Sequence, residues 1–334
     1  MQISVVIPIF NEAAVIPLLL ERLLPILFVI DPGYELILVD DGSTDQSPQL
    51  LAEAVQSNRN IRLICFTRNF GHQAAVTAGL DCARGDCVVV MDADLQDPPE
   101  LLPEMVALFR EGYDIVSPQR CARRGESWFK RTAASLFYLV MRKMVDRRVV
   151  PEVGDFRLFS LRAVHAIGCF REQHRFMRGL IAWLGLKEAI LPFERDARVA
   201  GETKYPLGKM IQFSWTAITS FSGLPLRLAL FVGMFFVLVD VVLVAYILYV
   251  TLILQTVVPG WASLILVQAL FSGVTLISIG LTGDYISRLY DESKGRPLYV
   301  VDRVHNFCPS DATAARGLFL EPKAKTASDT STSI

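Results

Sequence analysis

Two long apolar segments in the last third of the chain constrain its fold more than any other feature. Residues 228–254 contain one charged residue, Asp240, and residues 262–283 contain none. Each segment has the ~20 apolar residues that a helix needs to cross a bilayer, so together they predict a helical hairpin. Two buried core helices are the alternative, but two adjacent segments of this length are hard to bury. Near the bilayer centre Asp240 would cost about 3 kcal/mol, which predicts that it faces another helix or a polar groove.

The basic residues around this hairpin are distributed asymmetrically. The connector at 255–261 has no Lys or Arg, whereas basic residues flank the pair on both sides: Lys204, Lys209, Arg227, Arg288, Lys294, Arg296 and Arg303. Because cytosolic loops carry the excess of Lys and Arg, both ends of the hairpin are predicted to be cytosolic.

Over the whole chain the net charge is −1, so no global field favours nucleic acid as a partner.

The part of the chain before residue 120 alternates strand-like apolar runs with helical stretches. Strands are predicted at 3–10, 34–40, 61–67, 86–92 and 113–118, and further strands near 156–160 and 189–195, with a helix near 128–144. The intervening segments are long enough for crossover helices, which favours a doubly wound, mostly parallel α/β sheet. No GxGxxG motif follows the first strand, so a dinucleotide cofactor of the usual kind is not expected.

The fourth predicted strand ends in a cluster of carboxylates. After the apolar run at 87–91 the chain continues with Asp92 and Asp94. A run without polar alternation is typical of a central strand covered on both faces, and ligands bind at the carboxyl ends of such strands. Two aspartates one residue apart can direct oxygen atoms to one point, which suits Mg²⁺. The alternative is a turn alone, because Asp97–Pro99 is a typical helix start.

The second predicted strand ends in a similar acidic loop, VDDGSTD. Asp40 and Asp41 would lie at the same sheet edge as Asp92, because parallel strands end on one side. A carboxylate there can accept hydrogen bonds from an imide N–H or a ribose hydroxyl, as nucleoside recognition requires. The alternative assigns Asp40 to a turn and Ser43–Asp45 to a helix cap. Asp41 is therefore the residue that we predict to bind a ligand.

The order and spacing of four motifs resemble those of the inverting family-2 glycosyltransferases with the nucleotide-sugar (GT-A) fold. The motifs are VVIPIFNE, VDDGSTD, RNFGHQAA and MDADLQDPPE, within residues 1–225. Three further motifs, before the two predicted spans, are similar to those of polyprenyl-phosphate glycosyltransferases: GDFRLFS, HRFMRGLIAWLG and GETKYPLGKM. The chain resembles most the bactoprenol glucosyltransferases, with dolichyl-phosphate mannose synthases and aminoarabinose transferases as near relatives.

The resemblance implies roles for residues at the sheet edge. It implies that the nucleotide sugar is held by Pro8, Phe10, Glu12, Asp41 and Asp92. It also implies that Mg²⁺ or Mn²⁺ on the donor diphosphate is surrounded by Asp92, Asp94 and Gln96. Mutually repelling carboxylates would then be tolerated, because a divalent ion and its diphosphate neutralise the cluster.

The acceptor that the resemblance implies is polyprenyl phosphate, a lipid with an anionic head. A phosphate monoester has a second pKa of about 6, so this acceptor needs guiding cations more than a strong general base. The cations favoured for phosphate binding are Arg123, Arg131, Arg198 and Lys204. For each of them, a contact with solvent or lipid headgroups is an equal alternative.

Asp155 in GDFRLFS is the predicted catalytic residue on the acceptor side, with Asp94 and Arg157 completing the predicted catalytic set. It begins a predicted strand, and Arg157 follows on the same face because strand side chains repeat every two residues. Next to the anomeric carbon, Asp155 would orient the incoming phosphate or take a residual proton. The alternative is that Asp155 only pairs with Arg157 or caps a turn. A sugar or phosphate contact is open to His174, Arg175 and Arg178, whereas His72 is predicted to be structural.

Together these features predict an integral membrane glycosyltransferase of the bacterial inner membrane. Its parts are a cytosolic nucleotide-sugar domain at 1–205, an interfacial amphipathic helix at 206–225, a two-helix transmembrane hairpin at 226–285, a cytosolic juxtamembrane segment at 286–307 and a disordered tail at 308–334. The implied reaction is the inverting transfer of a hexose, with glucose favoured, from a UDP-sugar to polyprenyl phosphate. Another sugar such as mannose or aminoarabinose, or a catalytically silent membrane scaffold, are the alternatives. The hairpin also leaves a homo-oligomer open.

Overall fold

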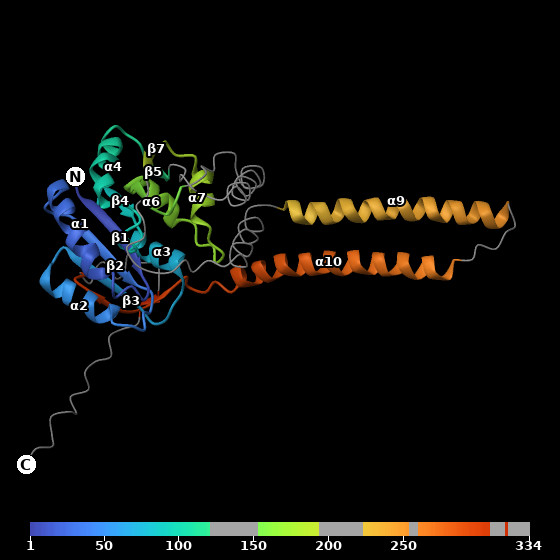
Figure 1. Cartoon of the computed structure of the whole chain (residues 1–334), viewed down its shortest axis with the longest axis horizontal. Coiled ribbons are helices and arrows are strands. Elements are labelled where there is room, and N and C mark those ends of the chain that lie inside the picture. Colours follow the sequence, from blue (N-terminus) through green and yellow to red (C-terminus); the bar gives the residue numbers. More distant parts are fainter. Residues whose placement is uncertain (121–152, 194–222, 254–259, 308–317, 320–334) are drawn as a thin grey trace, which may run out of the picture. The chain divides into compact units, whose positions relative to one another are not determined.

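The computed structural model describes residues 1–120, 153–193, 223–253, 260–307 and 318–319, and the chain divides into two compact units (Figure 1). One unit comprises Met1–Arg142, Asp146–Pro206 and Arg296–Ile334, and the other comprises Lys143–Val145 and Leu207–Gly295. Each unit is described by itself. Several predicted features lie outside the described residues: the helix at 128–144, all but the end of the interfacial helix at 206–225, and Arg123, Arg131, Arg198 and Lys204.

The first unit is built on a nine-stranded sheet with the strand order β7-β5-β6-β4-β1-β2-β3-β8-β9. The strands are β1 (Ile3–Ile9), β2 (Glu35–Asp40), β3 (Ile61–Phe66), β4 (Cys87–Val90), β5 (Ile115–Arg120), β6 (Arg157–Ser160), β7 (Glu188–Phe193), β8 (Val300–His305) and β9 (Leu318–Phe319). In the centre, β3, β2, β1 and β4 are parallel neighbours, whereas β6 runs antiparallel to β4 and β5. The doubly wound, mostly parallel sheet is confirmed, and each predicted strand matches an observed one.

Alternate side chains of the central strands pack against helices on opposite faces of the sheet. The helices are α1 (Ile16–Ile30), α2 (Ser47–Ser57), α3 (His72–Cys82), the 3-10 turn η1 (Pro99–Leu101), α4 (Leu102–Arg110), α6 (Leu161–Gly168) and α7 (Met177–Leu184). Val5 and Ile7 of β1 share a core with α1, α2 and α4, while Val6 shares a second core with α3, α6 and α7. Both faces are covered, which explains why these strands are apolar throughout.

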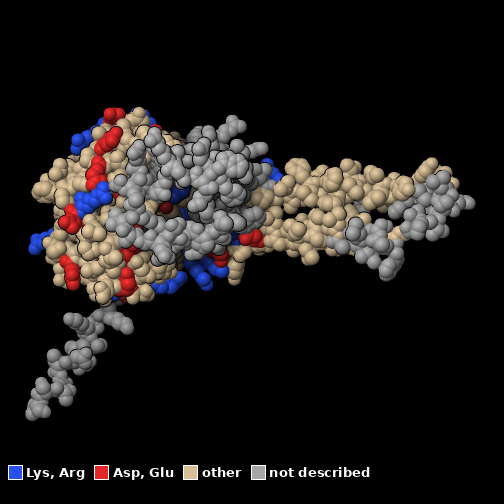
Figure 2. Space-filling model, viewed as in Figure 1, with Lys and Arg blue, Asp and Glu red and all other residues tan. Residues whose placement is uncertain are grey.

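The second unit contains two long helices, α9 (Leu224–Leu252) and α10 (Trp261–Ser293). Their segments Pro225–Tyr246 and Leu270–Ser293 are long and apolar enough to cross a membrane by length and composition. On the face seen in Figure 2, uncharged side chains cover most of both helices, whereas α10 carries Asp284, Arg288, Asp291 and Glu292 near its carboxyl end. Phe236 packs edge to face against Phe271, with ring centroids 5.4 Å apart, so α9 and α10 contact each other as the predicted hairpin requires.

After α10 the chain contributes two more strands to the sheet of the first unit, which the sequence pattern does not predict. The segment at 286–307 is predicted to be juxtamembrane and that at 308–334 to be disordered, but β8 pairs antiparallel with β3, and β9 pairs with β8. Among the β8 side chains, Val301 is buried, whereas Asp302 and Arg303 are exposed. A strand near the sheet edge with this mixed pattern shows neither a continuous apolar run nor strict alternation.

Candidate functional site

The loops after β1, β2, β3 and β4 meet at one edge of the sheet, because parallel strands have their carboxyl ends on the same side. The first two of these loops are joined by hydrogen bonds. The amide N–H of Asn11 donates to Ser43 Oγ at 3.0 Å, and the amide N–H of Thr44 donates to Asn11 Oδ1 at 2.8 Å. Asn11 has a φ of 56°, a left-handed conformation that Asn adopts more readily than most residues. These bonds fix the shape of the edge.

The residues predicted to hold the nucleotide lie along this edge with different exposures. Pro8 is buried in β1, Glu12 is half-buried, and Phe10 is 43% exposed. An exposed aromatic ring at the end of a central strand can stack against a base without any rearrangement of the core. Phe10 is therefore the residue of this group that is best placed for direct contact with a ligand.

Asp41 follows β2 and is only 3% exposed. Its Oδ1 accepts the amide N–H of Phe70 at 2.7 Å, and its Oδ2 accepts the amide N–H of Gly71 at 3.0 Å. Burial raises the pKa of Asp41 above its usual value, while these two amide hydrogen bonds oppose the rise. The carboxylate holds the loop after β3, and its bond to a nucleoside stays a prediction. The turn role considered for Asp40 is confirmed, because its Oδ1 accepts the amide N–H of Ser43 at 3.0 Å.

Gly42 packs against the backbone of the same loop. Its φ is 69°, and a Cβ there would lie 2.5 Å from the carbonyl carbon of Arg68 and 2.7 Å from the amide nitrogen of Asn69. We expect Gly42→Ala to lower the free energy of unfolding by more than about 2 kcal/mol, because backbone strain and overlap both act. Gly112→Ala is a matched control, since Gly112 has a φ of 88° with nothing within 4 Å. Thermal unfolding of the full chain measures both variants, and equal losses would contradict the close approach.

The end of β4 places two carboxylates at this edge. Asp92 is 35% exposed, and the half-buried Asp94 accepts the amide N–H of Gln96 at its Oδ1, at 3.1 Å. Gln96 itself is only 3% exposed, so the two aspartates are better placed than Gln96 to offer oxygen atoms to a ligand. The helix start that was the alternative for this segment is also present, because η1 begins at Pro99 and α4 follows it.

The two aspartates form an incomplete donor set for a metal ion. Within the described ranges, no group of three or more His, Cys, Asp or Glu side chains is arranged to hold a metal. Two partly exposed carboxylates nevertheless fit a hard divalent cation that takes its other oxygen ligands from a bound diphosphate and water. A metal at Asp92 and Asp94 would therefore depend on the nucleotide for its remaining ligands.

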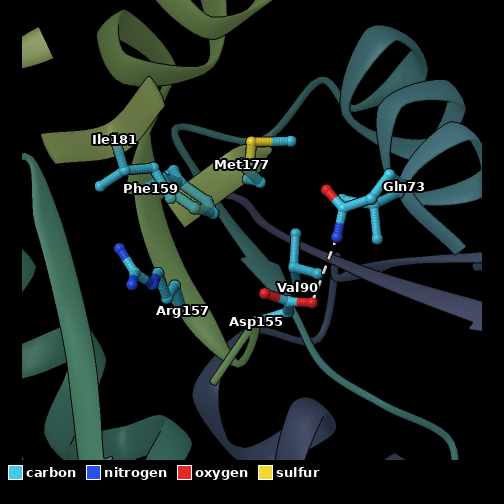
Figure 3. Close-up of a pocket in the computed structure, with 8 residues that line it drawn as sticks. Gln73, Val90, Asp155, Arg157, Phe159, Met177 and Ile181 are labelled. Atoms are coloured by element: carbon cyan, nitrogen blue, oxygen red, sulfur yellow. Dashed lines mark hydrogen bonds between the residues drawn. The ribbon is translucent and has the colours of Figure 1, made fainter. Parts of the chain in front are cut away.

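Asp155 precedes β6 and contacts donors on two helices, of which Figure 3 shows Gln73. Its Oδ2 lies 3.3 Å from His72 Nε2 and accepts a hydrogen bond from Gln73 Nε2 at 3.3 Å, both from α3. Its Oδ1 accepts a hydrogen bond from Arg178 Nε of α7 at 3.1 Å. His72 Nε2 also lies 3.7 Å from Asp92 Oδ1, so the imidazole connects the two acidic positions. We refer to His72, Gln73 and Arg178 as the Asp155 donors.

These contacts set the charges of Asp155 and His72. Burial alone would raise the pKa of Asp155, but the hydrogen bond from His72 and the charge of Arg178 hold it well below its usual range. Burial alone would lower the pKa of His72, but the hydrogen bond to Asp155 and the charge of Asp92 raise it above its usual value. Asp155 is therefore an anion at neutral pH, which favours an orienting role over the uptake of a proton.

We expect the pKa of His72 to lie above its usual value in the native protein and to fall in Asp155→Asn, where burial and the charge of Asp92 remain but the hydrogen bond and charge of Asp155 are lost. The pairing stabilises the fold fully below the unfolded-state pKa of about 6.5 and is lost as the pH rises through the higher folded-state pKa. NMR titration of the histidine ring protons, with His72→Asn for assignment, measures the shift. An unchanged His72 pKa in Asp155→Asn would contradict the pairing.

Arg157 has a different setting from the predicted one. It is 4% exposed, its Nη1 lies 3.7 Å from Glu188 Oε1, and its Nε donates to the carbonyl oxygen of Gly154 at 3.3 Å. Figure 3 shows its guanidinium turned away from Asp155. The two-residue period applies only within a strand, and β6 begins at Arg157, so Asp155 lies before it. This geometry favours a supporting role for Arg157 between the strands.

A small cavity lies behind Asp155. Its volume is about 10 Å³, and Gln73, Arg157 and Phe159 also line it (Figure 3). A space of this size holds about one water molecule and is far too small for a hexose. A sugar that contacts Asp155 would therefore lie on the opposite side of the carboxylate, toward His72 and Asp92.

His72 and Gln73 are the site residues that sequence reasoning missed. His72 is predicted to be structural, and no role is predicted for Gln73, yet both contact Asp155. The available signal is their place directly after Gly71, in the first turn of a helix that follows a parallel strand. Side chains in that position project at the carboxyl edge of the sheet, where ligands bind.

The sequence of this chain is similar to those of known glycosyltransferases. The family model described as Glycosyl transferase family 2 matches residues 4–168. The uncharacterized glycosyltransferase YkcC of Bacillus subtilis is 43% identical over 302 residues, which cover 90% of this chain and 94% of that protein. The bactoprenol glucosyl transferase of Shigella phage SfII is 35% identical over 309 residues, which cover 92% of this chain and 100% of that protein. Among solved structures, glucosyl-3-phosphoglycerate synthase from Mycobacterium tuberculosis, in complex with Mn²⁺ and UDP, is 22% identical, with a TM-score of 0.47 over 65% of this chain and 77% of that chain.

Proposed function

This chain belongs to glycosyl transferase family 2 and has a GT-A-like α/β fold, and from this premise we propose that it transfers a hexose from a UDP-sugar to polyprenyl phosphate. The products would be a polyprenyl-phosphate sugar and UDP. Glucose is the proposed hexose, because relatives named bactoprenol glucosyl transferase match most of the chain.

The observation that carries this proposal is the extent of that match. The alignment covers 92% of this chain and 100% of a bactoprenol glucosyl transferase. The part of this chain that lies outside the alignment is shorter than either α9 or α10. The shared part therefore includes both the sheet and the apolar helices. A lipid acceptor explains why a nucleotide-sugar domain is joined to helices that are apolar enough to cross a bilayer.

On the donor side, we assign Mg²⁺ or Mn²⁺ to Asp92 and Asp94, and the nucleoside to Pro8, Phe10, Glu12 and Asp41. When bound, a divalent ion supplies electrostatic stabilisation to the diphosphate that departs. Asp92 and Asp94 would hold it from the end of β4, whose residues Cys87–Val90 are all buried. A strand packed on both faces keeps the two carboxylates in a fixed position relative to Phe10 at the end of β1.

On the acceptor side, Asp155 is proposed to orient the cationic groups that meet the lipid phosphate. An acceptor phosphate with a second pKa of about 6 is already anionic near neutral pH, so the reaction needs no strong base. An oxygen of this phosphate would attack the anomeric carbon as the bond to UDP breaks, which inverts that carbon in one displacement. Asp155 holds both Arg178 and His72 next to this path, and its contact with His72 raises the pKa of the imidazole, which favours the charged form. Arg123, Arg131, Arg198 and Lys204 remain the proposed phosphate ligands.

We further propose that α9 and α10 span the membrane with the nucleotide-sugar domain in the cytosol. The basic residues on both flanks of the hairpin and their absence from the connector at 255–261 support this orientation. An anchored enzyme meets its acceptor at the bilayer surface, so a long isoprenoid need not be transferred into water.

The test uses the purified full-length chain with UDP-glucose, Mg²⁺ and polyprenyl phosphate in detergent micelles. We expect release of UDP together with the appearance of a lipid-linked hexose, and we expect both to require the acceptor and to stop when EDTA removes the divalent ion. NMR of the product determines whether the anomeric carbon is inverted. UDP release without lipid-linked sugar would reject polyprenyl phosphate as the acceptor.

The same assay separates the remaining alternatives. Turnover with GDP-mannose or UDP-aminoarabinose in place of UDP-glucose would keep the reaction class and replace the sugar. No turnover with any UDP- or GDP-sugar would favour a catalytically silent scaffold. The neighbouring, partly exposed carboxylates of Asp92 and Asp94 speak against a scaffold, because two such acidic groups at one edge repel each other unless a cation is bound.

A further inference from the structure

A short segment joins the end of α10 to β8 and packs beside β3. Tyr299 in this segment is 1% exposed, and its ring stacks on Phe66, the last residue of β3, with centroids 5.2 Å apart and an interplanar angle of 13°. The next residue, Val300, accepts the amide N–H of Thr67 at 3.1 Å through its carbonyl oxygen. The segment after α10 therefore supports the point at which β3 leads into the loop before α3.

This contact extends along the loop toward His72. Phe66 also meets Phe70 edge to face, with ring centroids 5.7 Å apart and an interplanar angle of 87°. The amide N–H of Phe70 is bound by Asp41, and α3 begins at His72 shortly after it. The loop before His72 and Gln73 is therefore held by two separate sets of contacts. Tyr299 acts through the rings of Phe66 and Phe70, and Asp41 binds the amide N–H of Phe70.

Tyr299 also reaches the third Asp155 donor by a second route. Its hydroxyl donates to Asp81 Oδ2 at 2.8 Å, and the carboxylate of Asp81 accepts two hydrogen bonds from Arg171, at 2.8 and 2.7 Å. Arg171 lies in the segment that leads into α7, and from α7 Arg178 binds Asp155. The contacts of one tyrosine therefore extend to both elements that supply the Asp155 donors.

Tyr299, Asp81 and Arg171 form a cluster in which each polar group requires its partner. Asp81 is 6% exposed, and a carboxylate that is removed from water is stable only when it is fully paired. Burial raises the pKa of Tyr299 above its usual value, so the hydroxyl keeps its proton and acts as a donor. A second bond ties the same two segments together, since Gln173 Nε2 donates to the carbonyl oxygen of Arg296 at 2.5 Å.

We propose that Tyr299 is a positioning residue for transfer, because it holds the loop before α3 and the segment before α7 so that their side chains meet at Asp155. We call Tyr299, Asp81 and Arg171 the Tyr299 clasp. The catalytic part of this inference rests on the proposed function, whereas the structural part does not. Tyr299 itself does not touch the predicted reacting groups and acts through His72 and Arg178.

Two variants separate the two routes. Tyr299→Phe keeps the ring on Phe66 and removes only the hydroxyl bond to Asp81 near the carboxyl end of α3, so it should loosen that end of α3 and the segment at 170–178 but not the loop at 67–73. Tyr299→Leu removes the stacking as well, so it should loosen both 170–178 and the loop at 67–73. Tyr34→Phe is the matched control, because Tyr34 is a buried tyrosine whose hydroxyl accepts a bond from Asn58 at 2.7 Å, near the amino end of β2.

Hydrogen–deuterium exchange of the full-length protein in detergent measures this loosening without any substrate. We expect faster exchange in the stated segments for the two Tyr299 variants and no change there for Tyr34→Phe. In the transfer assay, coupling through packed networks predicts that kcat falls about three-fold for Tyr299→Phe and about thirty-fold for Tyr299→Leu. The donor KM should stay within about two-fold of the native value, because the residues near the nucleoside are held by other bonds.

The inference is overturned if exchange at 170–178 in Tyr299→Phe is no faster than in the native protein. It is also overturned if Tyr34→Phe lowers kcat as much as Tyr299→Phe, since the effect would then follow stability alone. Should Tyr299→Leu fail to fold, Tyr299→Phe still decides. If the native protein transfers no sugar at all, the proposed function has failed, and exchange alone decides on the clasp.

Discussion

Asp94→Ala is expected to lower the kcat of transfer about a thousand-fold while the fold and membrane insertion stay intact. Asp94 supplies one of two carboxylates at the end of β4, and the stabilisation that a metal gives to a leaving diphosphate amounts to several kcal/mol. A loss of about 4 kcal/mol corresponds to a thousand-fold in rate. The half-buried side chain accepts the amide N–H of Gln96, and the loss of such a bond costs about 1 kcal/mol of stability. The measurement is kcat at saturating Mg²⁺ with purified protein.

Asp86→Ala is the matched control, because Asp86 lies at the other end of the same strand. It is 59% exposed, accepts the amide N–H of Gln2 at 2.8 Å and lies 3.9 Å from the N-terminal amine of Met1, so its removal costs these surface contacts and no proposed ligand. We expect near-native kcat for this variant. Near-native kcat for Asp94→Ala at saturating Mg²⁺ would instead refute the assignment of the metal to this edge.

Asp155→Asn is expected to lower kcat by about a hundred-fold to a thousand-fold, the range found when one preorganised polar group is lost from an active site. Asparagine preserves the shape of the side chain but removes the charge that His72 and Arg178 face. These two groups would then shift away from the path of the acceptor. Binding of the UDP-sugar should survive, because Asp155 lies on the acceptor side of the proposed site. Calorimetry measures donor affinity, and the transfer assay measures kcat.

The control for this variant is Asp114→Asn. Asp114 is 15% exposed and binds Arg162 at 2.5 Å and Ser160 Oγ at 3.0 Å, so it resembles Asp155 in burial and in having an arginine partner. It precedes β5 on the edge opposite the proposed site, and we expect it to affect stability only. Loss of UDP-sugar affinity in Asp155→Asn would move Asp155 to the donor side of the site.

The centre of the sheet could be predicted because β1, β2 and β4 are buried on both faces and are largely apolar runs. β4 is the clearest case, since Cys87–Val90 are all buried and the carboxylates follow at once. β8 could not be predicted in this way, because its neighbour β3 lies far away in the sequence and its own side chains alternate irregularly between exposed and buried. The pattern of apolar and polar residues within a segment does not specify which strand it pairs with, and α9 and α10 separate β3 from β8 in the sequence.

The individual aspartates of the candidate site could be predicted from the sequence, but the side chains that contact them could not. Asp92, Asp94 and Asp155 occupy recognisable motifs, and the structure connects Asp92 and Asp155 through His72. That connection depends on how the first turn of α3 lies against the end of β4 and the start of β6, which no spacing along the chain reveals. The prediction that Arg157 lies on the same strand face as Asp155 is wrong. Side chains repeat every two residues only within a strand, and β6 begins at Arg157.

The late return of the chain to the sheet has a consequence for biosynthesis. A ribosome makes the strands from β1 to β7 first, then α9 and α10, and only afterwards β8, which covers the open side of β3. Until that moment β3 is an exposed edge, and Phe66 lacks the aromatic ring that stacks on it. Completion of the nine-stranded sheet therefore waits for synthesis of both apolar helices, because β8 and β9 follow them in the chain.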